Sequence, residues 1–250
     1  MIKKIISYPL SIIYYLIFGL CLLIFHPIQW LALKLGGYNP HRKTVALLNL
    51  CLTRCILILG GKITINNFHK IPENAPLIFV SNHQSMNDIP PIIWFMRKYH
   101  PKFISKKELG SGIPSVSYNL RHGGSVLIDR KDPKQSLTAI INFAKYVEEN
   151  NYAAVIFPEG TRSRNGVPKR FSENGLKMLV KYMPSAYLIP ISINNSWKFL
   201  KHGGFPLDLG VHLKFDLHKP IEVKSMNFSD LFEKTEKTIK NGVALYTLKQ

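Results

Sequence analysis

The chain opens with a long apolar run. Between Ile5 and Leu33 no side chain is charged, apart from a titratable histidine at position 26. Such a run is long enough to cross the hydrocarbon core of a bilayer, which is about 30 Å thick. Because Pro27 is expected to bend or end a helix, the run predicts two apolar helical pieces, the second over 28–35.

A different pattern begins after Gly61, where short apolar runs alternate with longer amphipathic stretches. A helix predicted over 44–59 ends at the glycines that precede this change. The short runs predict strands over 62–66, 77–81, 102–105, 125–128, 153–157, 187–193 and 211–217. The longer stretches predict helices over 88–99, 113–121, 133–149, 171–182 and 229–245.

Alternation of strands and helices predicts the α/β class. We expect a largely parallel central sheet flanked by helices, with antiparallel strands at its edges, and an N-terminal helical membrane anchor. The sequence shows no internal repeat and no linker typical of a second globular domain. We therefore expect a hydrophobic two-helix anchor over 1–45 and one α/β domain over 46–250.

The charges next to the apolar run bear on how it meets a membrane. Lys3 and Lys4 precede the run, and His41, Arg42 and Lys43 follow it. Positively charged flanks prefer the cytoplasmic side, and one full crossing cannot place both of them there. This pattern favours a hairpin that re-enters one leaflet, at the cytoplasmic face of the cell membrane. A single span and a buried soluble helix pair remain the alternatives.

Composition narrows the class of partner. The formal net charge is +18, which predicts anionic partners without choosing among them. Long apolar stretches in so basic a chain favour a membrane surface over a nucleic acid. The three cysteines, at positions 21, 51 and 55, form no CxxC pair, and no His or Cys pairs lie at ligand spacing. We expect buried free thiols, no metal site and no nucleic-acid partner.

A histidine and an aspartate follow the predicted strand 77–81. His83 lies five positions before Asp88, a spacing that would put the two side chains on different faces of a continuous helix. They can meet only if His83 lies in a loop and Asp88 at the start of the next helix, which Pro90 and Pro91 favour. The carboxylate would then orient the imidazole as a general base. Spacing alone leaves open a purely structural pair.

Basic and hydroxyl residues follow two other predicted strands. Gly160, Thr161 and Arg162 offer backbone N–H groups, a hydroxyl and a guanidinium after strand 153–157, and an arginine can bind a phosphate through two parallel bonds. Arg130 and Lys106 follow neighbouring runs and could close on the same anion. In open α/β sheets ligands bind outside the carboxyl ends of the strands, so we expect these groups to converge there.

These segments together resemble the signatures of the glycerolipid acyltransferases, the lysophosphatidic acid acyltransferase (PlsC-like) family. The segment Asn82-His83-Gln84-Ser85-Met86-Asn87-Asp88 is similar to the first signature, and Phe157-Pro158-Glu159-Gly160-Thr161-Arg162-Ser163-Arg164 to the third. The segment Ile189-Pro190-Ile191 resembles the fourth signature. The second signature is similar to three regions of this chain: 103–109, 113–114 and 128–130. The resemblance covers about 71–194.

The resemblance implies an acyl transfer from acyl-CoA or acyl-carrier protein to the sn-2 hydroxyl of 1-acyl-sn-glycerol 3-phosphate, with no further cofactor. It implies that His83 is the base and Asp88 its partner, and that Pro190 lies on the acyl-donor side. It also implies a set of phosphate-binding residues: Glu159, Gly160, Thr161, Arg162, Arg130 and Lys106. Expected partners are membrane lipids, lysophosphatidic acid and the acyl donor.

Two other functions stay open at this point. Region 194–217 carries no assignable motif, so the acceptor could be another lysolipid, such as a lyso-aminolipid or a lysophospholipid. A non-catalytic basic protein that binds membrane surfaces is the alternative from another class.

Overall fold

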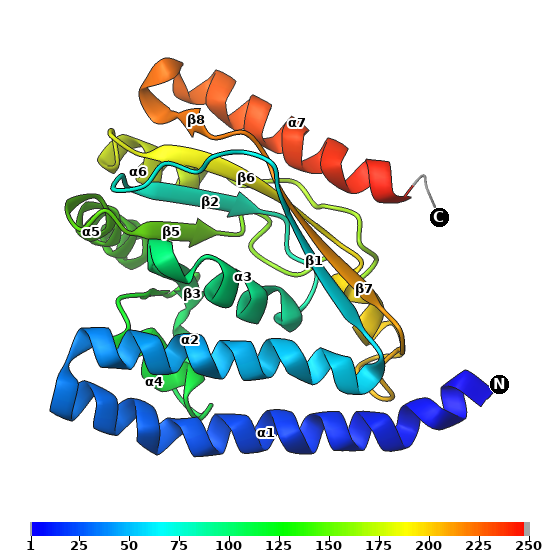
Figure 1. The fold of residues 1–250 in the computed structure, drawn as a ribbon. Helices are drawn as coiled ribbons and strands as arrows, with labels where there is room; N and C mark the ends of the chain where they lie inside the picture. Colours follow the sequence, from blue (N-terminus) through cyan, green and yellow to red (C-terminus); the bar gives the residue numbers. More distant parts are fainter. Residues whose placement is uncertain (1, 248–250) are drawn as a thin grey trace.

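The computed structural model of the chain describes residues 2–247, and its side chains up to residue 243. Eight strands form one sheet in the order β1-β7-β6-β2-β5-β3-β4, with β8 beside β6 (Figure 1). The strands are β1 (Lys62–Asn67), β2 (Leu77–Ser81), β3 (Pro101–Lys106), β4 (Val126–Ile128), β5 (Ala153–Ile156), β6 (Tyr187–Asn194), β7 (His212–Leu217) and β8 (Ile221–Glu222).

The central strands β6, β2, β5, β3 and β4 run parallel, whereas β7 and β8 run antiparallel to β6. The α/β class and the largely parallel sheet are therefore confirmed. Every residue of β2 is buried, as expected for a strand covered on both faces. Leu77 and Phe79 pack into the core on one face, and Ile78 and Val80 into the core on the other.

Seven helices surround this sheet in the described part of the chain: α1 (Ile2–Gly36), α2 (Tyr38–Cys55), α3 (Ile89–Phe95), α4 (Val116–His122), α5 (Pro133–Glu149), α6 (Glu173–Tyr182) and α7 (Phe228–Thr247). Residues of α5, α6 and α7 build the core on one face of the sheet. On the other face α3 and α2 lie between the sheet and α1, which forms the outermost layer (Figure 1).

The predicted break at Pro27 is wrong, because α1 runs without interruption from Ile2 to Gly36. Contacts with the rest of the protein hold the helix at this point. Ser115 donates from Oγ to the carbonyl of Leu22 at 2.6 Å and from its backbone N to Nδ1 of His26 at 3.0 Å. Pro27 removes the bond to the carbonyl of Leu23, four residues earlier, so the contacts of Ser115 dock the helix on the protein without replacing that bond.

The second helix is also longer than predicted, because α2 begins at Tyr38 and not at residue 44. Gly37, with φ of 72°, makes the sharp turn between α1 and α2. The boundary predicted after residue 45 falls inside α2. Near its end α2 contributes Cys55 to the core below the sheet, so this helix packs on the α/β domain along part of its length.

The outer helix α1 has an inverted distribution of polarity. Its buried residues are Ser7, Ser11, Tyr14 and Gln29, whereas most of its large apolar side chains are exposed. Ser11 Oγ accepts a hydrogen bond from the backbone N of Leu207, so polar contacts dock the helix on the protein. Among the described helices, α1 is long and apolar enough to cross a membrane. An exposed apolar face of this size indicates a lipid or protein contact.

Candidate active site

The predicted site residues gather at the carboxyl edge of the sheet. His83 follows β2, Glu159 follows β5, Lys106 ends β3, and Arg130 follows β4. These four strands are parallel and adjacent in the order β2-β5-β3-β4. The strand ends therefore converge on one edge, as the sequence predicted.

His83 and Asp88 form a direct pair, with Nδ1 of the imidazole 2.8 Å from Oδ2 of the carboxylate. His83 lies in the loop after β2, and Asp88 ends the short 3-10 turn Met86–Asp88 immediately before α3. The predicted loop-and-helix arrangement is confirmed. Asp88 Oδ2 also accepts hydrogen bonds from the backbone N of Gln84 and of Ser85, which fix the carboxylate in place.

The pair leaves one imidazole nitrogen available. A carboxylate accepts only, so Nδ1 of His83 carries the proton and Nε2 presents a lone pair. The Asp88 side chain is fully buried, whereas the His83 side chain is 18% exposed. His83 also stacks on the ring of Phe157, with 4.2 Å between centroids and an interplanar angle of 21°. The imidazole is thus oriented on one side and open on another, which suits a general base.

Glu159 holds the histidine loop from behind. Its Oε1 accepts a hydrogen bond from the backbone N of His83 at 2.8 Å, and its Oε2 accepts one from the backbone N of Lys169 at 2.7 Å. Ser163 completes the connection by donating from its backbone N to the carbonyl of His83 at 2.7 Å. The two signature segments are therefore joined through both backbone groups of His83.

This geometry does not support the prediction that Glu159 binds phosphate. Both of its oxygens already accept from backbone N–H groups, and a carboxylate would repel the anion. Burial raises the pKa of Glu159, against the opposing effect of these N–H donors. Its contacts make it a positioning residue for the imidazole.

The remaining basic residues lie around the loop that follows β5. Gly160 adopts φ of 66°, and its carbonyl accepts a hydrogen bond from Nη1 of Arg130. Burial lowers the pKa of Arg130, and Glu108 opposes that shift. Thr161 and Arg162 are exposed in the same loop, and Lys106 is exposed at the end of β3. Their phosphate-binding role stays a prediction.

Pro190 lies inside the sheet. It is buried in β6, in register with Val80 of β2. Pro190 therefore has no exposed surface that could contact an acyl donor directly. Its place on the acyl-donor side stays a prediction.

Several residues that support the site were missed by the sequence reasoning. The side chain of Asn82 makes two hydrogen bonds to the backbone of Ile193. Its Nδ2 donates to the carbonyl at 2.8 Å, and its Oδ1 accepts from the backbone N at 2.7 Å. Tyr14 of α1 donates to Oδ1 of Asn87 at 2.9 Å, next to Asp88. No local spacing signals a contact between positions so far apart in the chain. The outer helix is thus connected directly to the catalytic loop.

Metal-ligating clusters are not a feature of this edge. In the described part of the chain no three His, Cys, Asp or Glu side chains lie close enough together to hold a metal ion. The three cysteines are free, but the prediction that they are buried holds for Cys55 alone, since Cys21 and Cys51 are partly exposed.

Comparisons with known proteins agree with the architecture. A model of the Acyltransferase family matches residues 62–194. The 1-acyl-sn-glycerol-3-phosphate acyltransferase of Helicobacter pylori is 34% identical over 57% of this chain and 60% of its own length. The protein of the same name from Borreliella burgdorferi is 25% identical over 76% of each chain.

A solved structure shows the same fold. The crystal structure of the 1-acyl-sn-glycerophosphate (LPA) acyltransferase PlsC from Thermotoga maritima superposes with a TM-score of 0.81. The match covers 98% of each chain at 24% sequence identity, so the likeness extends to the two N-terminal helices.

Proposed function

Because the chain belongs to the Acyltransferase family, whose model covers the whole candidate site, we propose that it converts 1-acyl-sn-glycerol 3-phosphate to phosphatidic acid. The acyl group would come from a thioester, either acyl-CoA or acyl-carrier protein. Relatives from H. pylori and B. burgdorferi carry the name of this activity. The observation that supports it most is the oriented His83–Asp88 pair beside a basic loop.

The reaction follows from the free imidazole nitrogen. Nε2 of His83 accepts the proton of the sn-2 hydroxyl while that oxygen attacks the thioester carbonyl carbon. Asp88 stabilises the imidazolium that forms. The C–S bond then breaks, and the imidazolium returns its proton to the leaving thiolate, so that histidine and thiol are both neutral again. General-base catalysis of this kind contributes about 10²–10⁴-fold.

The basic residues place the hydroxyl. Arg162 directly precedes Ser163, which holds the backbone of His83, and Arg130 contacts the same loop at Gly160, so a phosphate bound by the two arginines would lie close to the base. Holding an acceptor in this way lowers the barrier by avoiding the loss of translational and rotational freedom during reaction. Lys106 adds a third positive charge from β3.

Replacing Arg162 by methionine tests the nature of the acceptor. We expect kcat/KM for lysophosphatidic acid to fall by about 10–100-fold, because a hydrogen bond to a charged group is worth about 1.5–3 kcal/mol. For a lysolipid without a phosphate, the same substitution should leave the rate unchanged. The measurement is product formation by wild type and variant across a panel of lysolipids. Arg164→Met, in the same loop, is the matched control.

An equal loss on all acceptors would contradict phosphate recognition by Arg162. Preference of the wild type for a lyso-aminolipid would instead select the other acceptor class. A protein without turnover on any lysolipid would favour the non-catalytic membrane-surface protein.

We also propose that α1 lies in one leaflet of a membrane, at its cytoplasmic face. Polar contacts dock its inner side on the protein, and its outer side is apolar: Leu16, Leu20 and Leu23 are 61, 53 and 58% exposed. The positive charges at both ends of the apolar run favour this placement over a crossing.

Changing these three leucines to serine should abolish flotation with vesicles. Burying one leucine is worth about 1.5–3 kcal/mol, so each change weakens binding about tenfold or more. A control with serine at Phe68 and Leu137, which are exposed outside α1, should float as the wild type does. Undiminished flotation of the triple variant would contradict the anchoring by this face.

A further inference from the structure

A partly open cavity lies at the end of the sheet remote from the candidate active site. It opens between the start of α2 and the first residues of β3, and its volume is about 30 Å³. One water molecule needs about 10–15 Å³, so the cavity takes two or three water-sized atoms, such as oxygens of an anion that enters from its open side. Lys102 is at the amino end of β3, whereas the site residues follow the carboxyl ends of the strands. At about 3.3 Å per residue, the four residues from Lys102 to Lys106 of the site separate the two places by roughly 13 Å along β3.

Cationic and neutral basic side chains line this cavity. The basic residues that line it are His41, Arg42, Arg97, His100 and Lys102. No aspartate or glutamate is among its described lining residues. None of the ion pairs in the described chain involves Arg42 or Lys102. A buried cation without a counter-charge is costly, so the group of side chains lacks a negative partner.

Lys102 is the most buried of these cations, at 4% exposure. Its Nζ donates to the phenol oxygen of Tyr38 at 2.7 Å and to the carbonyl of Gly123 at 2.5 Å, and it lies over the rings of Tyr38 and Tyr152. All these partners are neutral. Burial, and then the charge of Arg42, lower the pKa of Lys102 to about 7.

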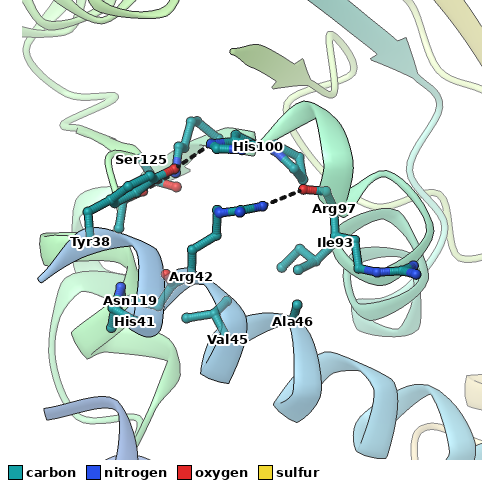
Figure 2. A pocket seen from close by; sticks show the side chains of 13 residues that line it. Tyr38, His41, Arg42, Val45, Ala46, Ile93, Arg97, His100, Asn119 and Ser125 are labelled. Atoms are coloured by element: carbon teal, nitrogen blue, oxygen red, sulfur yellow. Dashed lines mark hydrogen bonds between the residues drawn. The ribbon is translucent and has the colours of Figure 1, made fainter. Parts of the chain in front are cut away.

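Two further groups are unsatisfied at the same place. His41 is 1% exposed, and neither of its ring nitrogens has a hydrogen-bond partner among the described residues. The same holds for Nε of Arg42. Figure 2 shows Arg42 rising from α2 into the middle of the cavity, where Nη1 bonds to the carbonyl of Arg97, with Tyr38 and His100 above it. Tyr38 and Arg42 belong to the first turns of α2, where the helix dipole also favours an anion.

We propose that this cavity binds a phosphate group, held by Lys102, Arg42 and His41 between α2 and the sheet. The ligand supplies the negative charge that the lining residues lack and fills the open hydrogen-bonding capacity of His41 and Arg42. It can be a free phosphate or the headgroup of a membrane phospholipid, since α2 is the neighbour of the apolar helix α1. Bound there, it would fasten the two N-terminal helices to the α/β domain.

Calorimetric titration of the full-length protein with inorganic phosphate tests the proposal. We expect Lys102→Met to weaken binding at least tenfold, because hydrogen bonds to charged groups are among the strongest. Lys224→Met, which removes an exposed lysine elsewhere, is the matched control and should bind as the wild type does. Arg42→Met serves as a second variant, with the same expected loss, in case Lys102→Met does not fold.

Phosphate could also bind at the carboxyl edge of the sheet, and Arg162→Met separates the two sites. The proposed site keeps its phosphate in that variant and loses it in Lys102→Met. A second arm replaces free phosphate by vesicles of phosphatidylglycerol, with phosphatidylcholine vesicles for comparison, and records thermal unfolding. If binding of phosphate or of phosphatidylglycerol vesicles depends on Lys102, the result supports the site. The arm in which it does so identifies the source of the phosphate group. Equal responses of wild type, Lys102→Met and Lys224→Met in both arms would overturn it.

The pH dependence gives an independent readout, for which sulfate is the probe because its charge is constant over this range. The protonated form of Lys102 binds the anion, so affinity should be at least tenfold higher at pH 6 than at pH 9. Burial lowers the pKa of His100 to about 4, so it stays neutral throughout. The other titratable or charged groups around Lys102 are Tyr38, His41, Arg42, His122, Tyr146 and Tyr152. An affinity that does not change with pH would contradict the role of Lys102.

Discussion

Replacing His83 by alanine is expected to lower kcat for acyl transfer by about 10²–10⁴-fold. The loss follows from removing Nε2, the nitrogen that the Asp88 contact leaves free to accept a proton. The KM for the lysolipid should change little, since the proposed phosphate ligands are untouched. The measurement is the steady-state rate of phosphatidic acid formation by the purified variant.

The structure also predicts that this variant folds. The contacts that join the two signature segments use the backbone N and O of His83, which alanine retains. What is lost is the stack on Phe157 and the bond to Asp88. Thermal unfolding close to that of the wild type is the control. A folded His83→Ala protein with near-normal turnover would rule out the histidine as the base.

Replacing Asp88 by asparagine should have an effect of similar size, about 10²–10⁴-fold on kcat. Asp88 Oδ2 accepts from Nδ1 of His83 and from two backbone N–H groups. Because one oxygen accepts all three bonds, the amide oxygen of asparagine can take its place, but it carries no negative charge. The imidazolium that forms during proton transfer then lacks its counter-charge, so His83 is a weaker base.

Unfolding measurements separate this effect from a loss of structure. Asp230→Asn, which alters another carboxylate in the first turn of a helix, is the matched control and should keep full turnover. If Asp88→Asn loses no more activity than this control, Asp88 only caps the turn before α3. In that case the pair is structural, which was the alternative left open by the spacing.

The fold could largely be predicted because local pattern and tertiary structure agree. Helix α5 has the bounds that the sequence gives it, since Asp132 caps it and Pro133 begins it. Strand β2 is recognisable because all its positions are buried and all but the last, Ser81, are apolar. The break predicted at Pro27 is absent from α1, which contacts of Ser115, far away in sequence, dock on the protein at this point. Strand β8, of two residues, is too short to leave a pattern.

Site residues that lie close together in the sequence could be predicted. Contacts between residues far apart in the chain could not. His83 and Asp88 are five residues apart, so their meeting could be reasoned from the turn between them. The direction in which Glu159 points could not, and it faces the backbone of His83 instead of a ligand. The cavity beside Lys102 could not be predicted from the sequence, because its residues Tyr38 and Lys102 are far apart in the chain.

The most direct test of the account is acyl transfer by the purified wild-type protein to 1-acyl-sn-glycerol 3-phosphate, with acyl-CoA and with acyl-carrier protein as separate donors. We expect phosphatidic acid that carries the new acyl chain at sn-2 with at least one donor. We also expect a rate well above that with a lysolipid that lacks the phosphate. The account would be contradicted if neither donor gave phosphatidic acid while the same preparation acylated a phosphate-free lysolipid.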